Sequence, residues 1–363
     1  MRILLVLIIG AAGALGTRPG AARGTAKAAA VTPGHWVARD SQTASDIHAV
    51  TCPSAAVCYA TAYQGTIVST TDGGRTWTSL LSGATSGVWG ITCPSVTTCV
   101  AGSERDFHIL RSTDSGRTWD LAYQPDLATP DQSDGSETGP NFYHLGLYVA
   151  TCPTARTCLL VGTVGHIYRT TDGGTSWTVR AGAYSDVPQA TGTSRQSVLS
   201  DVSCPTTGVC YTVGFLCNCY PPYDVATGGE IAVSTDGGAS WRSRTIANIL
   251  QGVTCIAARA CIAIGLNGTI LRTTDGGRTW PAVPNPLTGG KTNLYAIACA
   301  GSVCRAVGGG ANDRGGVLLR SADGGRTWRA ESVPTTASLD AIACPRANLC
   351  YLGGAAGALL VGF

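Results

Sequence analysis

Charged side chains are scarce in this chain of 363 residues, since Asp, Glu, Lys and Arg together make up 13% of it. The first thirty residues hold four basic residues and no acidic one, so the remainder has 25 − 4 = 21 basic against 22 acidic residues. A near-neutral chain lacks the positive surface that nucleic acids require, and we expect no nucleic-acid partner. Its 44% apolar content also excludes charge-driven disorder.

Long hydrophobic runs are almost as scarce. The one clear run covers residues 3–16, follows Arg2 and is short for a membrane span. Small-x-small sites follow at 26–28 and 28–30, so we expect residues 1–30 to be a cleaved signal peptide. Cleavage nearer Ala14 and a retained anchor are alternatives. Residues 31–363 would then form the secreted or cell-surface protein, with no other membrane segment.

Cysteine, by contrast, is abundant, with 16 residues, of which 14 form local pairs. Structural zinc sites use cysteines two to four residues apart and need a second pair, whereas each pair here stands alone with four or five residues between its members. An even count at repeated spacing in an exported chain indicates disulfides, and we expect no metal or other cofactor. The predicted bonds are Cys52–Cys58, Cys93–Cys99, Cys152–Cys158, Cys204–Cys210, Cys255–Cys261, Cys299–Cys304 and Cys344–Cys350.

Two further cysteines, Cys217 and Cys219, lie outside this repeated spacing. They can pair with each other, stay free or bridge to a partner. The aromatic and proline residues around them, from Phe215 to Tyr223, suit contact with another molecule and equally suit an inert stapled loop.

An eight-residue pattern, [Ser/Thr]-x-Asp-x-Gly-x-x-Trp, occurs six times and contains six of the eight tryptophans. We interpret it as a hairpin turn in which the Asp carboxylate accepts backbone N–H bonds, glycine supplies positive φ and Trp packs back over the turn. We call these segments the Asp turns. Their aspartates are Asp72, Asp114, Asp172, Asp236, Asp275 and Asp323.

The cysteine pairs and the Asp turns alternate along the chain. Each unit reads as strand, cysteine-clipped turn, strand, glycine turn, strand, Asp turn and Trp strand, which predicts a four-stranded antiparallel sheet. There are seven cysteine pairs but six Asp turns, because the last unit stops after three strands. The segment around Trp36 resembles an orphan Trp strand. We therefore expect an all-β, seven-bladed propeller whose last blade is closed by the N-terminal strand.

The Asp turns resemble the Asp-box repeat of bacterial neuraminidases. With the segment GTILRTTDGGRTW at 268–280, residues 33–363 resemble the seven-bladed propellers of the photosystem II stability and assembly factors. Sialidases, Asp-box xyloglucanases and the sortilin ectodomain are more distant relatives by the same pattern. The resemblance implies a fold and not an activity, because the Asp box in these families is a structural turn away from the site.

The chain departs from these families in its clipped hairpins and in lacking the Arg-Ile-Pro motif of sialidases. None of its four glutamates can be assigned to the sialidase Tyr–Glu pair. These are Glu104, Glu137, Glu230 and Glu331.

The two faces of the expected propeller differ. The cysteine hairpins and Asp turns share one face and vary little in length, and we call it the scaffold face. The large insertions fall on the opposite face, the variable face, which we expect to carry function. Tolerated, inert insertions are the alternative. The insertions are 120–145, 181–198, 215–230, 282–293 and 309–315, and the first is acidic without the residue spacing of a calcium loop.

The first strand of each unit adds a second indication. Five positions before the first cysteine stands an aliphatic residue, and four positions before it stands a varied one, which topology places at the mouth of the central channel. Aromatic, amide and carboxyl groups there suit sugars or peptides, although they can also simply fill the channel. We call these the ring residues, and they are His48, Trp89, Tyr148, Ser200, Gln251, Tyr295 and Asp340.

These observations predict an exported, monomeric, non-catalytic binding or assembly module for an extracellular protein or glycan. The alternative is an exported glycoside hydrolase with Asp340 as its acid or base, for which the sequence places no second carboxylate. Four arginines just before Asp turns are expected to pack on neighbouring Trp faces. They are Arg111, Arg169, Arg272 and Arg320.

Overall fold

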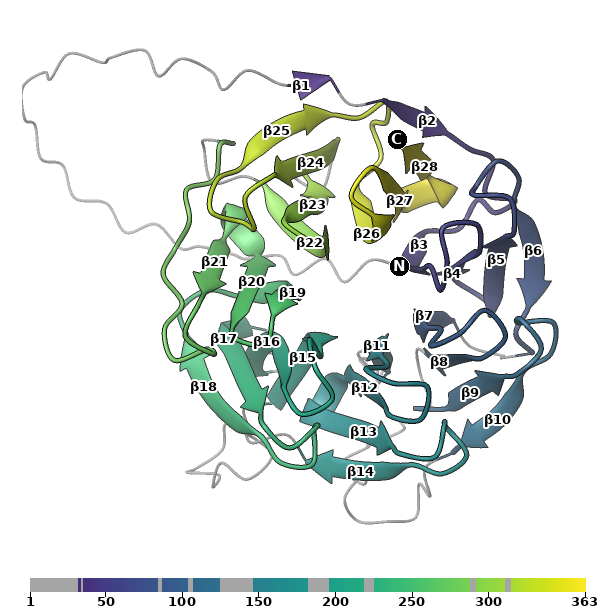
Figure 1. Cartoon of the computed structure of the whole chain (residues 1–363), viewed down its shortest axis with the longest axis horizontal. Helices are drawn as coiled ribbons and strands as arrows, with labels where there is room; N and C mark the ends of the chain where they lie inside the picture. Colours follow the sequence, from purple (N-terminus) through teal and green to yellow (C-terminus); the bar gives the residue numbers. More distant parts are fainter. Residues whose placement is uncertain are drawn as a thin grey trace, which may run out of the picture.

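The computed structural model describes residues 32–33, 35–83, 87–103, 107–124, 146–181, 196–218, 225–287, 292–310 and 315–363. Seven antiparallel sheets stand around a central axis, with the first strand of each nearest that axis (Figure 1). This confirms the all-β, seven-bladed propeller. In these residues no helix has the length and apolar character needed to cross a membrane.

Blades 1 to 4 follow one another along the chain, and each has four strands joined in order. Their strands are β3 (Ile47–Thr51), β4 (Cys58–Ala62), β5 (Thr66–Thr70) and β6 (Thr78–Leu81); β7 (Val88–Thr92), β8 (Cys99–Ser103), β9 (Ile109–Ser112) and β10 (Asp120–Tyr123); β11 (Leu147–Thr151), β12 (Cys158–Gly162), β13 (His166–Thr170) and β14 (Thr178–Ala181); β15 (Gln196–Ser203), β16 (Cys210–Asn218), β17 (Val225–Ser234) and β18 (Arg242–Ile246).

Blades 5 to 7 complete the ring, together with short 3-10 turns η2 (Thr163–Gly165), η3 (Leu266–Gly268) and η5 (Ala355–Gly357). The strands of these blades are β19 (Leu250–Ala257), β20 (Ala260–Gly265) and β21 (Ile270–Thr273); β22 (Asn293–Ala300), β23 (Val303–Gly309), β24 (Gly316–Ser321) and β25 (Arg329–Ser332); β26 (Leu339–Arg346), β27 (Leu349–Gly354) and β28 (Leu359–Gly362).

The N-terminal strand β2 (Trp36–Ala38) is the fourth strand of blade 7, as predicted. It pairs antiparallel with β28, and Trp36 stands opposite Gly362. The preceding β1 (Thr32–Pro33) adds a parallel strand to the outer edge of blade 6. Trp36 also donates its indole N–H to Glu331 of blade 6 at 2.7 Å. One segment near the N-terminus therefore ties the last two blades together.

In blade 5 the fourth strand is reduced to one bridge, between Leu271 and Ala282. The segment after Trp280 reads PAVPNP, and proline has no N–H to donate to a ladder. Two backbone bonds keep the segment in place: Arg272 N–H donates to Pro281 O at 3.0 Å, and Val283 N–H donates to Ile270 O at 2.8 Å.

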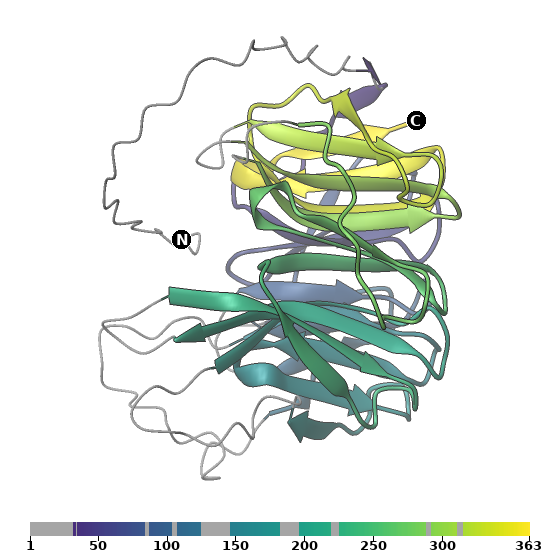
Figure 2. The ribbon, with the colours of Figure 1, turned by 90° about the vertical axis from the view of Figure 1, so that its left-hand side faces the viewer.

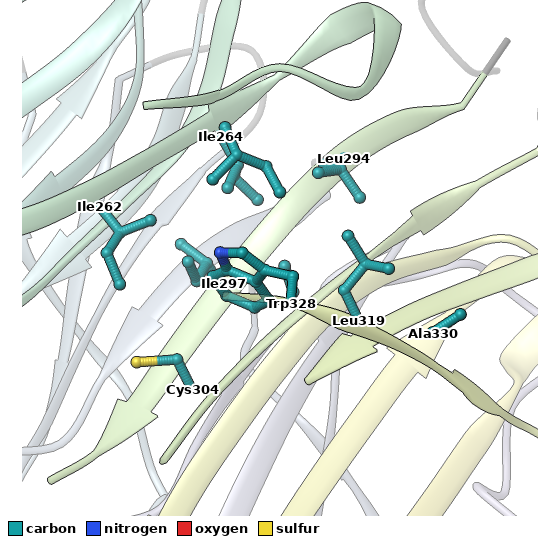
Figure 3. Close-up of a cluster of buried hydrophobic side chains, with 10 residues drawn as sticks. Ile262, Ile264, Leu294, Ile297, Cys304, Leu319, Trp328 and Ala330 are labelled. Carbon is teal, nitrogen blue, oxygen red and sulfur yellow. The ribbon is translucent and has the colours of Figure 1, made fainter. Parts of the chain in front are cut away.

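The hydrophobic core lies between blades as well as inside them. Figure 3 shows one such cluster, in which Ile262 and Ile264 of blade 5 face Leu294, Leu319 and Trp328 of blade 6. The aliphatic residue five positions before each first cysteine is at most 1% exposed in all seven blades. The blades therefore stack through apolar faces, which stabilises the ring.

The Asp turns adopt the predicted geometry. In blade 3 the Asp172 carboxylate accepts the N–H groups of Thr175 and Ser176, at 2.9 and 3.0 Å, and Trp177 donates its indole N–H to Gly174 O at 3.2 Å. Gly174 has φ +86°, and a Cβ there would lie 3.2 Å from Val100. Hydrogen bonds to the ionised form lower the pKa of Asp172, and that of Asp114 to about 2.

All seven predicted disulfides are present, each closing a hairpin on the scaffold face. They indicate an oxidising, extracytoplasmic environment. Each described Asp turn is bonded to the hairpin of its own blade, as when Gly173 N–H donates to Arg156 O at 2.8 Å. Cys217 is also disulfide-bonded, and Cys219 lies outside the described residues.

The arginines before the Asp turns reach further than expected. Arg111, Arg169 and Arg272 each donate an Nε–H to the carbonyl of the residue after Asp in the next blade's turn, at 2.8–2.9 Å. The hydrogen-bond partner of each of these three arginines is thus a backbone carbonyl of the neighbouring blade, and their packing on Trp faces stays a prediction. Arg320 precedes blade 7, whose described strands carry no Asp turn, and its side chain is exposed.

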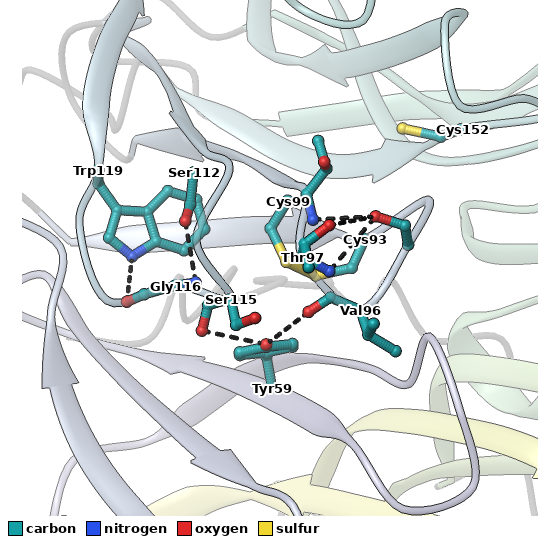
Figure 4. Close-up of a disulfide and its surroundings, with 12 residues drawn as sticks. Tyr59, Cys93, Val96, Thr97, Cys99, Ser112, Ser115, Gly116, Trp119 and Cys152 are labelled. Atoms are coloured by element: carbon teal, nitrogen blue, oxygen red, sulfur yellow. Dashed lines mark hydrogen bonds between the residues drawn. A yellow bond between two sulfur atoms is a disulfide. The ribbon is translucent and has the colours of Figure 1, made fainter.

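A tyrosine replaces the arginine in other blades. The Tyr59 hydroxyl donates to Val96 O and lies 3.1 Å from Ser115 O in blade 2, and Figure 4 shows both bonds beside the Cys93–Cys99 disulfide. Tyr211 binds the matching hairpin carbonyl in blade 5, and Arg305 binds that in blade 7. The donors lie in the same cross-strand pair of each blade, on one strand or the other. In blade 1 the donor is Tyr59, opposite Ser69, and in blade 2 it is Arg111, opposite Val100. Each blade thus contributes a polar tie to the next from the same place.

Candidate functional site

Each ring residue sits on a β-bulge. In blade 1 the register passes from Ile47–Ala62 to Ala49–Thr61, so His48 is an extra residue without a partner opposite. The first strands of the other six blades shift register at the corresponding point. A bulge re-aims the side chain of its extra residue. The bulge therefore leaves one residue per blade without a partner on the neighbouring strand.

The seven ring residues line one cavity of about 510 Å³ on the propeller axis. The structure thus brings together all the residues that the sequence placed at the channel mouth, from blades that are far apart in the chain. A cavity of this volume is in the range that holds a small ligand or a few residues of a peptide.

Three of the four aromatic ring residues form a continuous stack over three blades, and the fourth, Tyr295, lines the cavity from blade 6. His48 stacks on Trp89 with ring centroids 5.2 Å apart, and Trp89 stacks on Tyr148 at 4.6 Å. Tyr63 contacts His48 edge-on at 4.4 Å. The inner strands come close enough for this because of Gly90, where a Cβ would lie 2.8 Å from Tyr148 O. One side of the cavity is therefore an ordered aromatic wall.

The other side is polar and holds a carboxyl group that the sequence analysis did not single out. Asp201 follows the bulge residue Ser200, and its carboxylate accepts the N–H of Val202 at 2.7 Å and that of Val253, in blade 5, at 2.8 Å. Burial raises the pKa of Asp201 to about 7. Asp201 therefore bridges two blades and titrates near neutral pH.

Two more carboxylates line the cavity, Asp340 of blade 7 and Asp46 just before blade 1. Asp340 accepts a hydrogen bond from Ser338 at 3.2 Å, and Asp46 accepts one from the N–H of Ala356 at 2.7 Å. Among the described residues, no Lys or Arg lines this cavity. The site is thus acidic and aromatic.

The insertions on the variable face lie largely outside the described residues, including most of 120–145 and 181–198. The insertion at 215–230 is described in part, and it extends the hairpin of β16 and β17, the longest strands of the propeller. This blade projects beyond the others on one side of the disc (Figure 2). Phe215 and Ala226 of this hairpin line the cavity. The hairpin thus forms a wall at the cavity mouth.

Glu230, at the base of this hairpin, is 1% exposed and accepts a hydrogen bond from the Ser197 hydroxyl. Burial raises its pKa to about 7. Glu230 does not line the cavity, so it serves the hairpin rather than a ligand.

A signal for Asp201 existed in the sequence. Three positions before the first cysteine, the other blades have only alanine, glycine or valine, so an aspartate there is out of place. Tyr63 and Asp46 lie outside the aligned first strands, and no pattern in the sequence connects them to the cavity.

No protein-family model and no curated protein sequence matches the chain. Solved structures do. YCF48 bound to D1 peptide superposes with a TM-score of 0.68 at 18% identity, covering 93% of this chain and 99% of that one. The chain is similar in fold to YCF48. YCF48 from Cyanidioschyzon merolae superposes with a TM-score of 0.64 at 19% identity, covering 90% of this chain and 98% of that one. The WD40 repeats of RRP9 superpose with a TM-score of 0.64 at 10% identity, covering 91% of this chain and 98% of that one. The expected likeness to photosystem II assembly factors is confirmed for the fold.

Proposed function

We propose that this chain is an exported, monomeric, non-catalytic binding module that recognises a segment of another protein through the variable face and the central cavity. The observation that carries the proposal is the set of seven bulges, which turn one side chain per blade into a single cavity. Because no blade needs these side chains for its own ladder, their variety fits recognition better than folding.

Export is supported by the seven disulfides and by the apolar run at 3–16 before the propeller. Recognition of a protein is supported by the fold likeness to YCF48, one structure of which holds a D1 peptide. A segment of extended peptide or a loop can enter a cavity of about 510 Å³ while its flanks contact the loops around the mouth.

A photo-crosslinking residue at Gln64, in the exposed β4–β5 turn of the variable face, tests this directly. On the purified mature protein, incubated with a random-peptide display library, we expect peptides to be captured at this site. Filling the cavity by Ser200→Trp should reduce capture at least tenfold. Val96→Glu, an exposed change on the scaffold face, is the matched control and should leave capture unchanged.

Equal capture by the Ser200→Trp protein and the wild type would overturn the proposal. A glycan array run in parallel tests whether the module binds a glycan instead of a protein segment. Saturable glycan binding without peptide capture would make the module a lectin instead.

One observation favours the hydrolase as a second candidate. Asp201, with a pKa of about 7, and Asp340 line the same cavity, and glycosidases pair a protonated with an ionised carboxyl group. Both Asp201 oxygens already accept backbone N–H bonds, which stabilise the ionised carboxylate and oppose a role as general acid. A panel of fluorogenic glycosides decides the question, because turnover that Asp201→Asn and Asp340→Asn both abolish would establish the enzyme.

A further inference from the structure

The charges and rings of the cavity together select a class of ligand. Three aspartates line it, and no described Lys or Arg does. Within a partly enclosed cavity, carboxylates interact more strongly with a ligand charge than they would in open water. An anionic group would meet only like charge there, whereas a cation would meet opposite charge.

The aromatic series ends at a defined place. Going round the axis, His48, Trp89 and Tyr148 stack on one another, and the next ring position is Ser200, whose side chain is the smallest of the seven. Asp201 follows Ser200 directly in the chain and lines the same cavity. Blade 3 therefore contributes an aromatic ring to the cavity, and blade 4 contributes the small residue Ser200 and the carboxyl group of Asp201, which accepts the N–H of Val253 on its blade 5 side.

From this arrangement we propose that the cavity binds an organic cation, a guanidinium or ammonium group, between the ring of Tyr148 and the carboxylate of Asp201. Cations bind over aromatic faces within about 6 Å of the centroid, and Arg adds planar hydrogen bonds to a carboxylate. The inference rests on the proposed function, and it names the anchor residue of the partner as an Arg or Lys side chain. Free amines share this chemistry and are the second source of such a group.

Calorimetry of the mature protein near pH 8 tests the proposal with three pentapeptides, Ac-Gly-Ser-X-Ser-Gly-NH2, in which X is Arg, Lys or citrulline. Citrulline has the shape of Arg without its charge. We expect the Arg peptide to bind at least tenfold more tightly than the citrulline peptide. Choline and spermidine form the other arm, and tighter binding of either than of both cationic peptides would assign the cavity to a free amine.

Variants locate the cation. Tyr148→Leu removes the ring and Asp201→Asn the charge, and each should weaken the Arg peptide about tenfold while leaving the citrulline peptide unchanged. Ser200→Trp would extend the stack across the proposed position and abolish binding. Asp120→Asn, an exposed residue of the outer strand β10, is the charge-matched control. Circular dichroism and the melting temperature identify any variant that fails to fold.

Equal affinity for the Arg and citrulline peptides would overturn the cation proposal, and so would full affinity in the Ser200→Trp protein. Capture of uncharged peptides at the Gln64 crosslinker would then leave the proposed function standing without its cationic anchor. If the wild-type protein neither captures peptides nor binds the cationic peptides, both the proposed function and the cation proposal are wrong.

Discussion

The hydroxyl of Tyr351, in the last blade, donates a hydrogen bond of 3.0 Å to the carbonyl of Ala55, in the hairpin of the first blade. Two residues that are 296 positions apart in the chain thus join where the ring closes. Tyr59 and Tyr211 make the same contact between interior blades, so the closing junction uses the same joint as the others.

The equivalence of tyrosine and arginine ties can be tested in blade 1. Tyr59→Val removes the bonds to Val96 and Ser115 and should lower the free energy of unfolding by about 2–3 kcal/mol. Adding Ser69→Arg recreates the pair Val100–Arg111 of blade 2 and should restore about 1 kcal/mol, because the guanidinium can reach Ser115 O. Urea unfolding measures both. Absence of any gain from Ser69→Arg would show that the two ties are not interchangeable.

The two buried acids give the stability a pH dependence of defined sign. The folded pKa values of Asp201 and Glu230, about 7, exceed the unfolded value of about 4. The folded state therefore holds more protons between these values, and the free energy of unfolding falls as pH rises from about 4 to 7. Glu230→Gln and Asp201→Asn should each flatten this slope in urea titrations at several pH values. Asp120→Asn should keep it.

The Asp turns act in the opposite direction. Their aspartates have lowered pKa values in the folded protein, that of Asp114 being about 2. Their stabilisation is complete above pH about 4 and is lost as pH falls through the folded pKa. Asp172→Asn should lower the melting temperature at pH about 6. In strong acid the melting temperatures of the variant and the wild type should lie closer together. A constant difference down to pH about 2 would contradict this.

Closure by the N-terminal strand predicts a large effect from one residue. Trp36 is 8% exposed, pairs with Gly362 and binds Glu331. Trp36→Ala should cost about 3–5 kcal/mol and expose the edge of β28, which favours association through that edge. Light scattering and limited proteolysis check this. Leu81→Ala, at an exposed position of the outer strand β6, is the control.

Much of this architecture was predictable because it repeats. Seven cysteine pairs and six Asp turns predicted the blades, and the mismatch between the two counts predicted that Trp36 completes the last one. The ring residues were found by alignment on the cysteines. The bulges were not found, since an extra residue leaves no mark when every blade carries it at the same point.

Other features depend on residues that only the fold brings together. The raised pKa of Asp201 comes from burial against blade 5, where Val253 lies 52 residues further along the chain. The Arg and Tyr ties depend on cross-strand register and on the turn of the following blade. The weak fourth strand of blade 5 follows from its prolines, which the prediction of one common four-stranded unit did not take into account.

The bulges separate what this protein recognises from what keeps it folded. The aliphatic residue at the preceding position is buried in the core, whereas the bulge residue has no partner on the neighbouring strand. A substitution at any one of the seven positions therefore changes the chemistry of the cavity without removing a cross-strand pair from the blade. Ligand specificity in propellers of this kind can therefore change by single substitutions at the bulge positions while the blades keep their pairing.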